Sequence, residues 1–485
     1  MVAQSVSRQP KYTDGGLLFV NSSHPDDVKK KGTQRSLRSH SMRCAFRGRP
    51  SRKRRPHAVT YALEKVYVIA DTGICQHGDA LQQIPIPKSL GLWPFPGEMH
   101  TRAQELIYFM NAESDYVFRP FRTVWFSMAL TDATAFQLCM ANAAMFMAQR
   151  KQPATFQYEK CSEVLEYYGK CLGQITKRLE CRDDRTSDGV IVTILGLICH
   201  DIYVGLWARW ATHIRGLHRI IQLRGGYKQI NSSLALWASW YDALGSAAHD
   251  TCPQFPEYMC DFSPPFLPAR TPLLGQTMCK LMEKDCVGMQ HIISALDRIR
   301  YIAEVVNDHY REPEFWRRED DLSPLYMIGP VTHTLLSVPR VNSKADDHNP
   351  TELVREMARL AMLILLAALK RMYSFFLDEI EFTTLTAKFC SVLLIYRQNP
   401  LIYQHNDSMH RLQLWALLTV ASLQPFADRT LHVTEIRRCM SYLDMRSATD
   451  AFQLSHEIVW IDIIGGTNTE NGSLMNAINN ATPPP

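Results

Sequence analysis

The residues whose types and spacing most directly suggest chemistry are arginines and lysines near the N-terminus. Arg47-Gly48-Arg49-Pro50 has the pattern of an extended segment that fits a narrow DNA minor groove, where both guanidinium groups meet the negative potential. Arg52-Lys53-Arg54-Arg55 resembles the short basic clusters that nuclear import receptors bind. The predicted contacts are made by Arg47, Arg49, Arg52, Lys53, Arg54 and Arg55. A solvated arm with only nonspecific affinity for polyanions is the alternative.

The charge distribution separates this basic arm from the rest of the chain. Residues 1–56 hold 14 of the 53 lysines and arginines but 3 of the 48 acidic residues, so the remaining 429 residues of the 485 are net acidic. No acidic residue lies within residues 29–55, the segment expected to contact DNA. Residues 1–60 are poor in large apolar side chains, which predicts a disordered arm. Residues 61–97 contain Ile84-Pro85-Ile86-Pro87 and are predicted to be extended.

Residues that could perform acid-base or nucleophilic catalysis occur in isolated places. His200-Asp201 has the composition of half an acid-base pair, but adjacent residues of a helix point about 100° apart. His249, Asp250 and Cys252 contain a nucleophile and a base, yet a helix end before Pro253 accounts for them more simply. Phosphate-binding, dinucleotide-binding, serine-nucleophile and zinc-protease motifs are absent from the sequence. We therefore expect no enzyme, no catalytic residue and no cofactor.

The cysteines indicate a reducing compartment and no metal centre. The 13 cysteines are scattered, odd in number and mostly placed in apolar runs, and no Cys-x-x-Cys pair occurs anywhere. Buried free thiols are the expected state. The first ten residues lack the apolar core of a signal peptide. The longest apolar run, Leu360 to Leu369, is far shorter than the roughly 20 residues of a membrane span, so no contact with a membrane is expected.

Helical periodicity dominates beyond residue 98 and predicts an all-α fold of about a dozen helices in one body, residues 98–464. No hairpin turn of the Asn-Gly type lies between alternating strands. The tail, residues 465–485, is polar and ends in three prolines, which predicts a disordered end. The expected helices cover residues 98–110, 119–130, 132–150, 154–180, 187–206, 208–224, 233–249, 270–310, 351–378, 381–397, 409–422, 432–444 and 449–461.

Two of these helices meet at a glycine joint. Trp210, Ile214, Leu217 and Ile221 recur at the spacing of one apolar helix face. Gly225-Gly226 follows the last of them, where a left-handed cap favours glycine, and Arg224 suits the negative end of the helix. The first helix is therefore predicted to stop there, and Ser232 or Ser233 is predicted to cap the second.

Asp242 lies on this second helix among Trp237, Trp240 and Leu244. A carboxylate buried among such side chains is costly unless it has a partner. We expect Asp242 to pair with Arg215, Arg219 or Arg224 across the joint. Simple exposure of Asp242 on the surface is the alternative.

The joint carries a resemblance to a known family. His213-x-x-Gly216-Leu217, then Arg224-Gly225-Gly226, a helix with Trp and Asp242, and Pro253-x-Phe255-Pro256 resemble the fungal-specific transcription factor domain. Residues 19–43 and 90–109, and the helices with Trp415 and Trp460, are similar more weakly. The resemblance implies a nuclear regulator with an all-helical body, in which His213, Gly216, Arg224, Gly225, Gly226 and Asp242 form a structural motif.

The zinc binuclear cluster that regulators of this type often carry is missing from this sequence. Such a cluster needs six thiolates, including two Cys-x-x-Cys pairs, whereas the N-terminal cysteines here are Cys44 and Cys75. The expected partners are thus a nuclear import receptor, DNA through residues 29–55, and other transcriptional regulators. An all-helical enzyme or small-molecule-binding protein unrelated to transcription is the alternative function.

Overall fold

The computed structural model describes residues 100–112, 129–130, 132–152, 154–258, 288–312, 315–317, 322–341, 349–373, 380–399, 407–424, 429–466 and 471–481. The basic arm, the Pro-containing segment and every arginine and lysine predicted to bind DNA or an import receptor lie outside these ranges, so those predictions stay predictions. All described residues belong to one compact unit.

The all-α prediction is confirmed, since the described ranges contain helices and no strand. None of these helices combines the length and the apolar content needed to cross a bilayer. The α-helices are α3 (Thr101–Ala112), α5 (Ala133–Lys151), α6 (Ser162–Glu180), α7 (Asp188–Tyr203), α8 (Trp207–Leu223), α9 (Ser232–His249), α11 (Met289–His309), α12 (Ser323–Ser337), α13 (Pro350–Met372), α14 (Ile380–Gln398), α15 (Asp407–Leu423), α16 (Thr430–Tyr442), α17 (Ala448–Ile458), α18 (Asp462–Gly465) and α19 (Gly472–Asn480). Short 3-10 turns cover η5 (Tyr158–Lys160), η6 (Tyr227–Gln229) and η7 (Phe315–Arg317).

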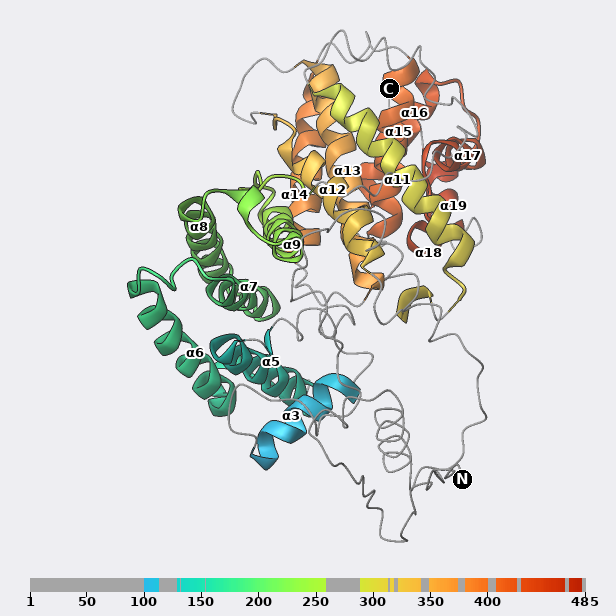
Figure 1. Cartoon of the computed structure of the whole chain (residues 1–485). Helices are drawn as coiled ribbons and strands as arrows, with labels where there is room; N and C mark the ends of the chain where they lie inside the picture. Colours follow the sequence, from blue (N-terminus) through green and yellow to red (C-terminus); the bar gives the residue numbers. More distant parts are fainter. Residues whose placement is uncertain are drawn as a thin grey trace, which may run out of the picture. The chain divides into compact units, whose positions relative to one another are not determined.

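Two helices organise the packing. Helix α13 contacts α11, α12, α14 and α15, and its residues from Leu353 to Ala367 are buried. The apolar run Leu360 to Leu369 is therefore core. Helix α9 contacts α7 and α8 on one side and α12 and α14 on another (Figure 1). This explains why α9 is buried along most of its length, from Leu234 to Ala248.

Helix α12 is not among the expected helices, and Pro330 lies inside it. An internal proline removes one hydrogen bond and disfavours a helix by about 3 kcal/mol. Here tertiary packing outweighs that cost, since Leu325, Ile328 and Leu335 are buried and α12 packs against α9 and α11. A Cβ on Gly329 would lie 3.4 Å from the Trp240 ring, so the two helices approach closely at this residue.

The prediction of a disordered end is wrong for residues 472–480, which form α19. Leu474 and Ile478 lie one helical turn apart and are both buried, where α19 contacts α16 and α17. Asn471 connects the helix to the preceding turn, because its Nδ2 donates to the carbonyl oxygens of Gly465 and Gly466. Two apolar residues of a polar tail can thus pack a helix against the body when both lie on the same helix face.

Other helix boundaries differ from the predictions. The expected helix 154–180 begins at Ser162, and the residues before it form a turn and η5, which directs Tyr158 towards α7. The expected helix 187–206 ends at Tyr203, before Gly205 at φ 69°. In the expected helix 270–310, the described part begins after Gly288, which has φ 84°. Residues 119–128 and 270–287 lie outside the described ranges.

Candidate functional site

The glycine joint between α8 and α9 has the predicted conformation. Gly225 and Gly226 have φ 109° and 101°, and Gly226 N donates to Ile221 O at 2.9 Å. Residues with a Cβ rarely adopt such angles, so α8 stops where the sequence indicated. The expected cap of α9 is wrong by one or two residues, because Asn231 supplies it: Asn231 Oδ1 accepts from Ser233 N at 2.7 Å.

Asp242 is buried, as expected, but its expected pairing with an arginine is wrong. Asp242 Oδ2 accepts from the backbone amides of Gln254 at 2.6 Å and Phe255 at 2.7 Å, and Ser246 Oγ donates to Oδ1 at 3.4 Å. Burial raises the pKa of Asp242 to about 6, although these hydrogen bonds favour the ionised form. Asp242 therefore fixes the turn that carries Pro253 and Pro256 back across α9.

The three candidate arginines lie elsewhere. Arg215 and Arg219 are exposed on α8. Arg224 Nη1 contacts Asp188 Oδ1 and donates to Thr186 O at 3.3 Å, which ties the end of α8 to the start of α7. Gly216 is exposed, and a Cβ built on it would meet nothing within 4 Å. Nothing in the structure explains the choice of glycine at 216.

His213 belongs to a polar contact between α7 and α8. Its Nε2 lies 3.4 Å from Asp201 Oδ2, and Arg209 Nη2 lies 2.6 Å from Asp201 Oδ1. Asp201 is fully buried, and burial raises its pKa to about 7 while Arg209 opposes the shift. Burial also lowers the pKa of His213 to about 4. These groups hold α8 against α7.

His200 points to different partners from those of Asp201, as adjacent residues of a helix should. Its Nδ1 lies 2.6 Å from Asn142 Oδ1 on α5, and its Nε2 lies 2.9 Å from the Tyr158 hydroxyl. The Tyr168 ring of α6 stacks on the imidazole, with the centroids 5.0 Å apart. Burial lowers the pKa of His200 to about 3, so the ring is neutral: Nδ1–H donates to Asn142 and Nε2 accepts from Tyr158. His200 thus connects α5, α6 and α7.

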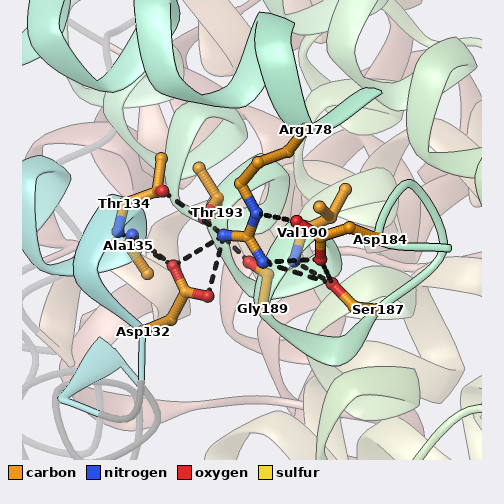
Figure 2. A network of polar contacts seen from close by, with 9 residues as sticks. All are labelled: Asp132, Thr134, Ala135, Arg178, Asp184, Ser187, Gly189, Val190 and Thr193. Atoms are coloured by element: carbon orange, nitrogen blue, oxygen red, sulfur yellow. Dashed lines mark hydrogen bonds and ion pairs between the residues drawn. The ribbon is translucent and has the colours of Figure 1, made fainter. Parts of the chain in front are cut away.

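Arg178, near the end of α6, joins the N-termini of two other helices (Figure 2). Its Nη1 donates to both carboxylate oxygens of Asp132, the N-cap of α5, at 2.9 and 2.8 Å. Its Nη2 donates at 3.2 Å to Ser187 Oγ, the N-cap of α7, and its Nε donates at 2.7 Å to Asp184 Oδ2. The hydrogen bonds from Arg178 and Ser187 lower the pKa of Asp184. One guanidinium group therefore sets the relative positions of three helix ends.

Gly189 makes room for this network. A Cβ at residue 189 would lie 1.9 Å from Asp132 Oδ2 and 2.8 Å from Arg178 Nη2. No side chain fits there without displacing a carboxylate that also accepts from Thr134 N and Ala135 N. Glycine is required by this contact, and Figure 2 shows Gly189 directly beneath the guanidinium group.

A second ion cluster lies at the end of α9. Asp250 is the left-handed C-cap, with φ 50°, as expected for a helix end before Pro253. It accepts from Arg359 Nη1 and Nη2 of α13 at 2.7 and 3.0 Å and from Lys388 Nζ of α14 at 2.9 Å. Burial opposes ionisation, but these cations and Arg340 lower the pKa of Asp250. Of the candidate nucleophile cluster His249, Asp250 and Cys252, Asp250 thus forms a structural joint, and Cys252 is an exposed free thiol.

These polar groups connect helices, and each makes its contacts within the chain. In the described ranges, no group of three His, Cys, Asp or Glu side chains could hold a metal ion. The described cysteines are free thiols, and burial raises the pKa of Cys171 and Cys199 to about 12, so both are protonated near neutral pH. These contacts join α5, α6 and α7 to one another, α8 to α7, and α9 to α13 and α14.

Sequence reasoning missed Arg178, Asn142 and the role of Asp250. Asp132 and Ser187 stand immediately before apolar helical runs, which is a detectable N-cap signal. No signal in the sequence gives the partner of Arg178, because that partner depends on how α5, α6 and α7 converge.

Comparisons with known proteins agree with the family resemblance noted in the sequence. Residues 106–322 match the family model described as fungal specific transcription factor domain. A stretch of 91 residues is 30% identical to the phomenoic acid biosynthesis cluster-specific transcriptional regulator of Leptosphaeria maculans, and covers 18% of this chain and 17% of that relative. The match thus spans about a sixth of the relative's length. No solved structure matches the chain. Residues 106–322, a little under half of the chain, are therefore similar to the fungal specific transcription factor domain.

Proposed function

We propose that the chain is a nuclear transcriptional regulator whose helical body is the regulatory part and whose basic arm directs nuclear import and contacts DNA. The observation that carries the proposal is the match of residues 106–322 to a transcription factor domain in a chain that also has a basic segment at residues 29–55. The comparisons support the regulatory role, and the arm's two tasks rest on its charge.

The proposed contact with DNA is electrostatic and carries little sequence information. This sequence lacks the cysteines for a zinc binuclear cluster. Arg-Gly-Arg in a minor groove responds to groove width and potential more than to base identity. Selection of target genes would then depend on other transcriptional regulators bound to the helical body.

Imaging a fluorescently tagged full-length chain tests the import step. We expect a nuclear signal that spreads into the cytoplasm when Arg52, Lys53, Arg54 and Arg55 are replaced by alanine. Replacing Lys29, Lys30 and Lys31 is the matched control, because it also removes basic residues from the arm but spares the cluster. Uniform cytoplasmic signal for the unaltered chain would contradict nuclear regulation.

Titration of a DNA duplex with purified protein tests the proposed contact between the basic arm and DNA. We expect the logarithm of the binding constant to fall linearly with the logarithm of salt concentration, because Lys and Arg release counterions from phosphates. Replacing Arg47 and Arg49 by alanine should weaken binding most for A·T-rich duplexes. If protein lacking residues 1–56 binds as the full chain does, the arm is not the DNA contact.

Mapping chromatin occupancy tests regulation itself and identifies the genes. Peaks at promoters whose transcripts change when the gene is deleted are the expected result. An absence of enriched sites, with no change in transcripts, would favour the alternative of an all-helical enzyme or small-molecule-binding protein.

A further inference from the structure

Helix α8 and the joint that follows it carry basic residues and no acidic residue. Residues 202–241 contain no aspartate or glutamate and five lysines and arginines, namely Arg209, Arg215, Arg219, Arg224 and Lys228. The chain beyond residue 56 is net acidic as a whole. This part of the helical body is therefore a local concentration of positive charge.

Two of these arginines face solvent without an anionic partner. Arg215 and Arg219 lie one helical turn apart, and both are exposed. In the part of the chain that the structure describes, the ion pairs of α8 and its C-cap are made instead by Arg209, His213 and Arg224. The charges of Arg215 and Arg219 are thus available to an anion from outside the chain.

Arg215 and Arg219 belong to a stripe directly opposite the buried face of α8. At about 100° per residue, the residues of this stripe fall within about 80° of one another. All of them are exposed: Ala208, Thr212, Arg215, Arg219 and Gln222. The buried residues lie on the other side of the helix: Trp210, Ile214, Leu217, Ile220 and Ile221. The basic stripe is therefore separate from the face that packs α8 against α7.

Gly216 borders the basic stripe, and no described contact within the chain requires a glycine there. It is exposed, and a Cβ on it would meet nothing within 4 Å. Glycine is nevertheless less favourable than alanine inside a helix. A residue without a side chain lets another molecule approach the helix backbone closely. A partner that lies against this side of α8 would account for the glycine.

The basic stripe suits the major groove of a DNA duplex. That groove is about 12 Å wide and admits an α-helix, and Arg, Gln and Thr are side chains that bind base edges in it. The stripe is about 21 Å long at about 1.5 Å per residue. A protein partner would bury apolar area as well as charge, whereas the large apolar side chain that α8 exposes is Leu223, at its last residue. DNA is therefore the better fit.

We propose that α8 lies in the major groove of DNA, with Arg215 and Arg219 bound to guanine edges. Three residues join α7 to α8, and Gly205 among them has φ 69°. The connection is as short as that of helix-turn-helix proteins, in which the second helix enters the groove. Helix α7, which is buried from Val190 to Ile202, packs against α8 (Figure 1). The inference rests on the proposed function and adds base readout by the helical body to the electrostatic contact of the arm.

Selection from a pool of random-sequence duplexes by the purified full chain tests this contact. We expect an enriched sequence that contains guanine, and protection of guanine N7 from dimethyl sulfate in that sequence. Replacing both Arg215 and Arg219 by glutamine should abolish the protection. It should also lower the affinity for the selected duplex about 10-fold or more, because two bidentate contacts with guanine are lost. Replacing Arg411 and Arg446, which are also exposed, is the matched control and should change neither result.

Gly216→Leu tests the close approach without changing any charge. The added side chain enters open space, so the melting temperature should not fall, while protection of guanine N7 should be lost. The variant with glutamine at residues 215 and 219 should also keep its melting temperature, because both arginines are exposed. Protection that persists in either variant would overturn the proposal.

A variant of the arm separates this contact from the proposed function. Replacing Arg47 and Arg49 by alanine should weaken binding to the selected duplex but leave guanine N7 protected. Binding through the arm with no protected guanine would overturn the contact of α8 and leave the contact of the arm intact. An acidic protein segment would then be the partner left for the stripe. If the unaltered chain bound no duplex, both DNA contacts would be overturned, whereas nuclear imaging would still test import by itself.

Discussion

Asp250 and Arg359 form a buried ion pair across 109 residues of sequence. Asp250 Oδ1 accepts from Arg359 Nη1 at 2.7 Å, and Oδ2 accepts from Nη2 at 3.0 Å. Arg359 is fully buried and also donates to Glu356. The pair joins the end of α9 to the middle of α13, so it connects the two helices around which the described body packs.

Removing one partner of this pair should be strongly destabilising. Asp250→Asn keeps the size of the side chain and tolerates the left-handed backbone, but it leaves the Arg359 charge without one of its two anionic partners. Loss of one partner of a buried pair costs about 3–5 kcal/mol. Urea unfolding followed by circular dichroism would measure the change.

Lys388→Gln is the control for that prediction. Lys388 binds the same carboxylate at 2.9 Å, but its side chain is 43% exposed. An ion pair that reaches solvent contributes about 0–1 kcal/mol. Equal losses for the two variants would show that burial of Arg359 is not what makes Asp250 important.

Gly189→Ala should destabilise the junction of α5, α6 and α7. Its Cβ would overlap Asp132 Oδ2 and displace a group bound by Arg178 and two backbone amides. Such overpacking typically costs about 1–3 kcal/mol. Gly216→Ala is the matched control, because that position is open and helical, and it should gain up to about 1 kcal/mol. A melting temperature that rises for both variants would contradict the observed contact at Gly189.

Asp242 should make stability fall as pH rises through the mildly acidic range. The unfolded carboxyl ionises near pH 3.8 and the folded one near pH 6. Between these values the folded state holds a proton that the unfolded state has released, so the contribution of Asp242 decreases as pH increases. At about 1.4 kcal/mol per pKa unit, the total is about 3 kcal/mol. Unfolding free energies of the unaltered chain and Asp242→Asn from pH 4.5 to 7 should therefore diverge, and parallel curves would refute the shift.

The titration of His200 should make stability change with pH in the opposite direction, so that stability rises as pH rises. Its pKa is lowered from 6.5 to about 3, so below pH 6.5 the unfolded state takes up a proton that the folded state excludes. This contribution to stability is present above pH 6.5 and is lost as pH falls, by about 1.4 kcal/mol per pH unit. His200→Gln removes the titration, and its unfolding free energy should depend less on pH between 5 and 6.5. An NMR titration in which the His200 ring protonates near pH 6.5 would contradict the prediction.

Local signals allowed much of the fold to be predicted, and the failures have physical causes. The end of α8 follows from Gly225-Gly226, because the required backbone angles are a property of that residue type. Helix α12 was missed because Pro330 disfavours a helix locally, whereas its stability comes from α9 and α11. Helix α19 was missed for the same reason, because its apolar residues are buried only by packing against α16 and α17.

The partners of charged residues were harder to predict than the helices. The burial of Asp242 could be predicted from its apolar neighbours in the sequence. The groups that donate to its carboxylate could not, because they are the backbone amides of Gln254 and Phe255. Every residue except proline has such an amide, so the amino-acid type does not mark these two residues as partners. Sequence reasoning therefore favoured the arginines, whose charge is evident from their type. Long-range partners such as Arg178 with Asp132 require the packing of the helices to be known.

The Asp250–Arg359 pair limits which segment of this protein can fold when it is moved into another chain. Asp250 lies inside the stretch that matches the family model, residues 106–322, and Arg359 lies outside it. Helix α9 is likewise covered by α12 and α14, which both follow residue 322. A fragment cut at residue 322 would expose the apolar side of α9 and leave Asp250 without its cations. Chimaeras between relatives should therefore exchange residues through at least α14 together with the matched stretch, because the limit of sequence similarity runs through the middle of a shared core.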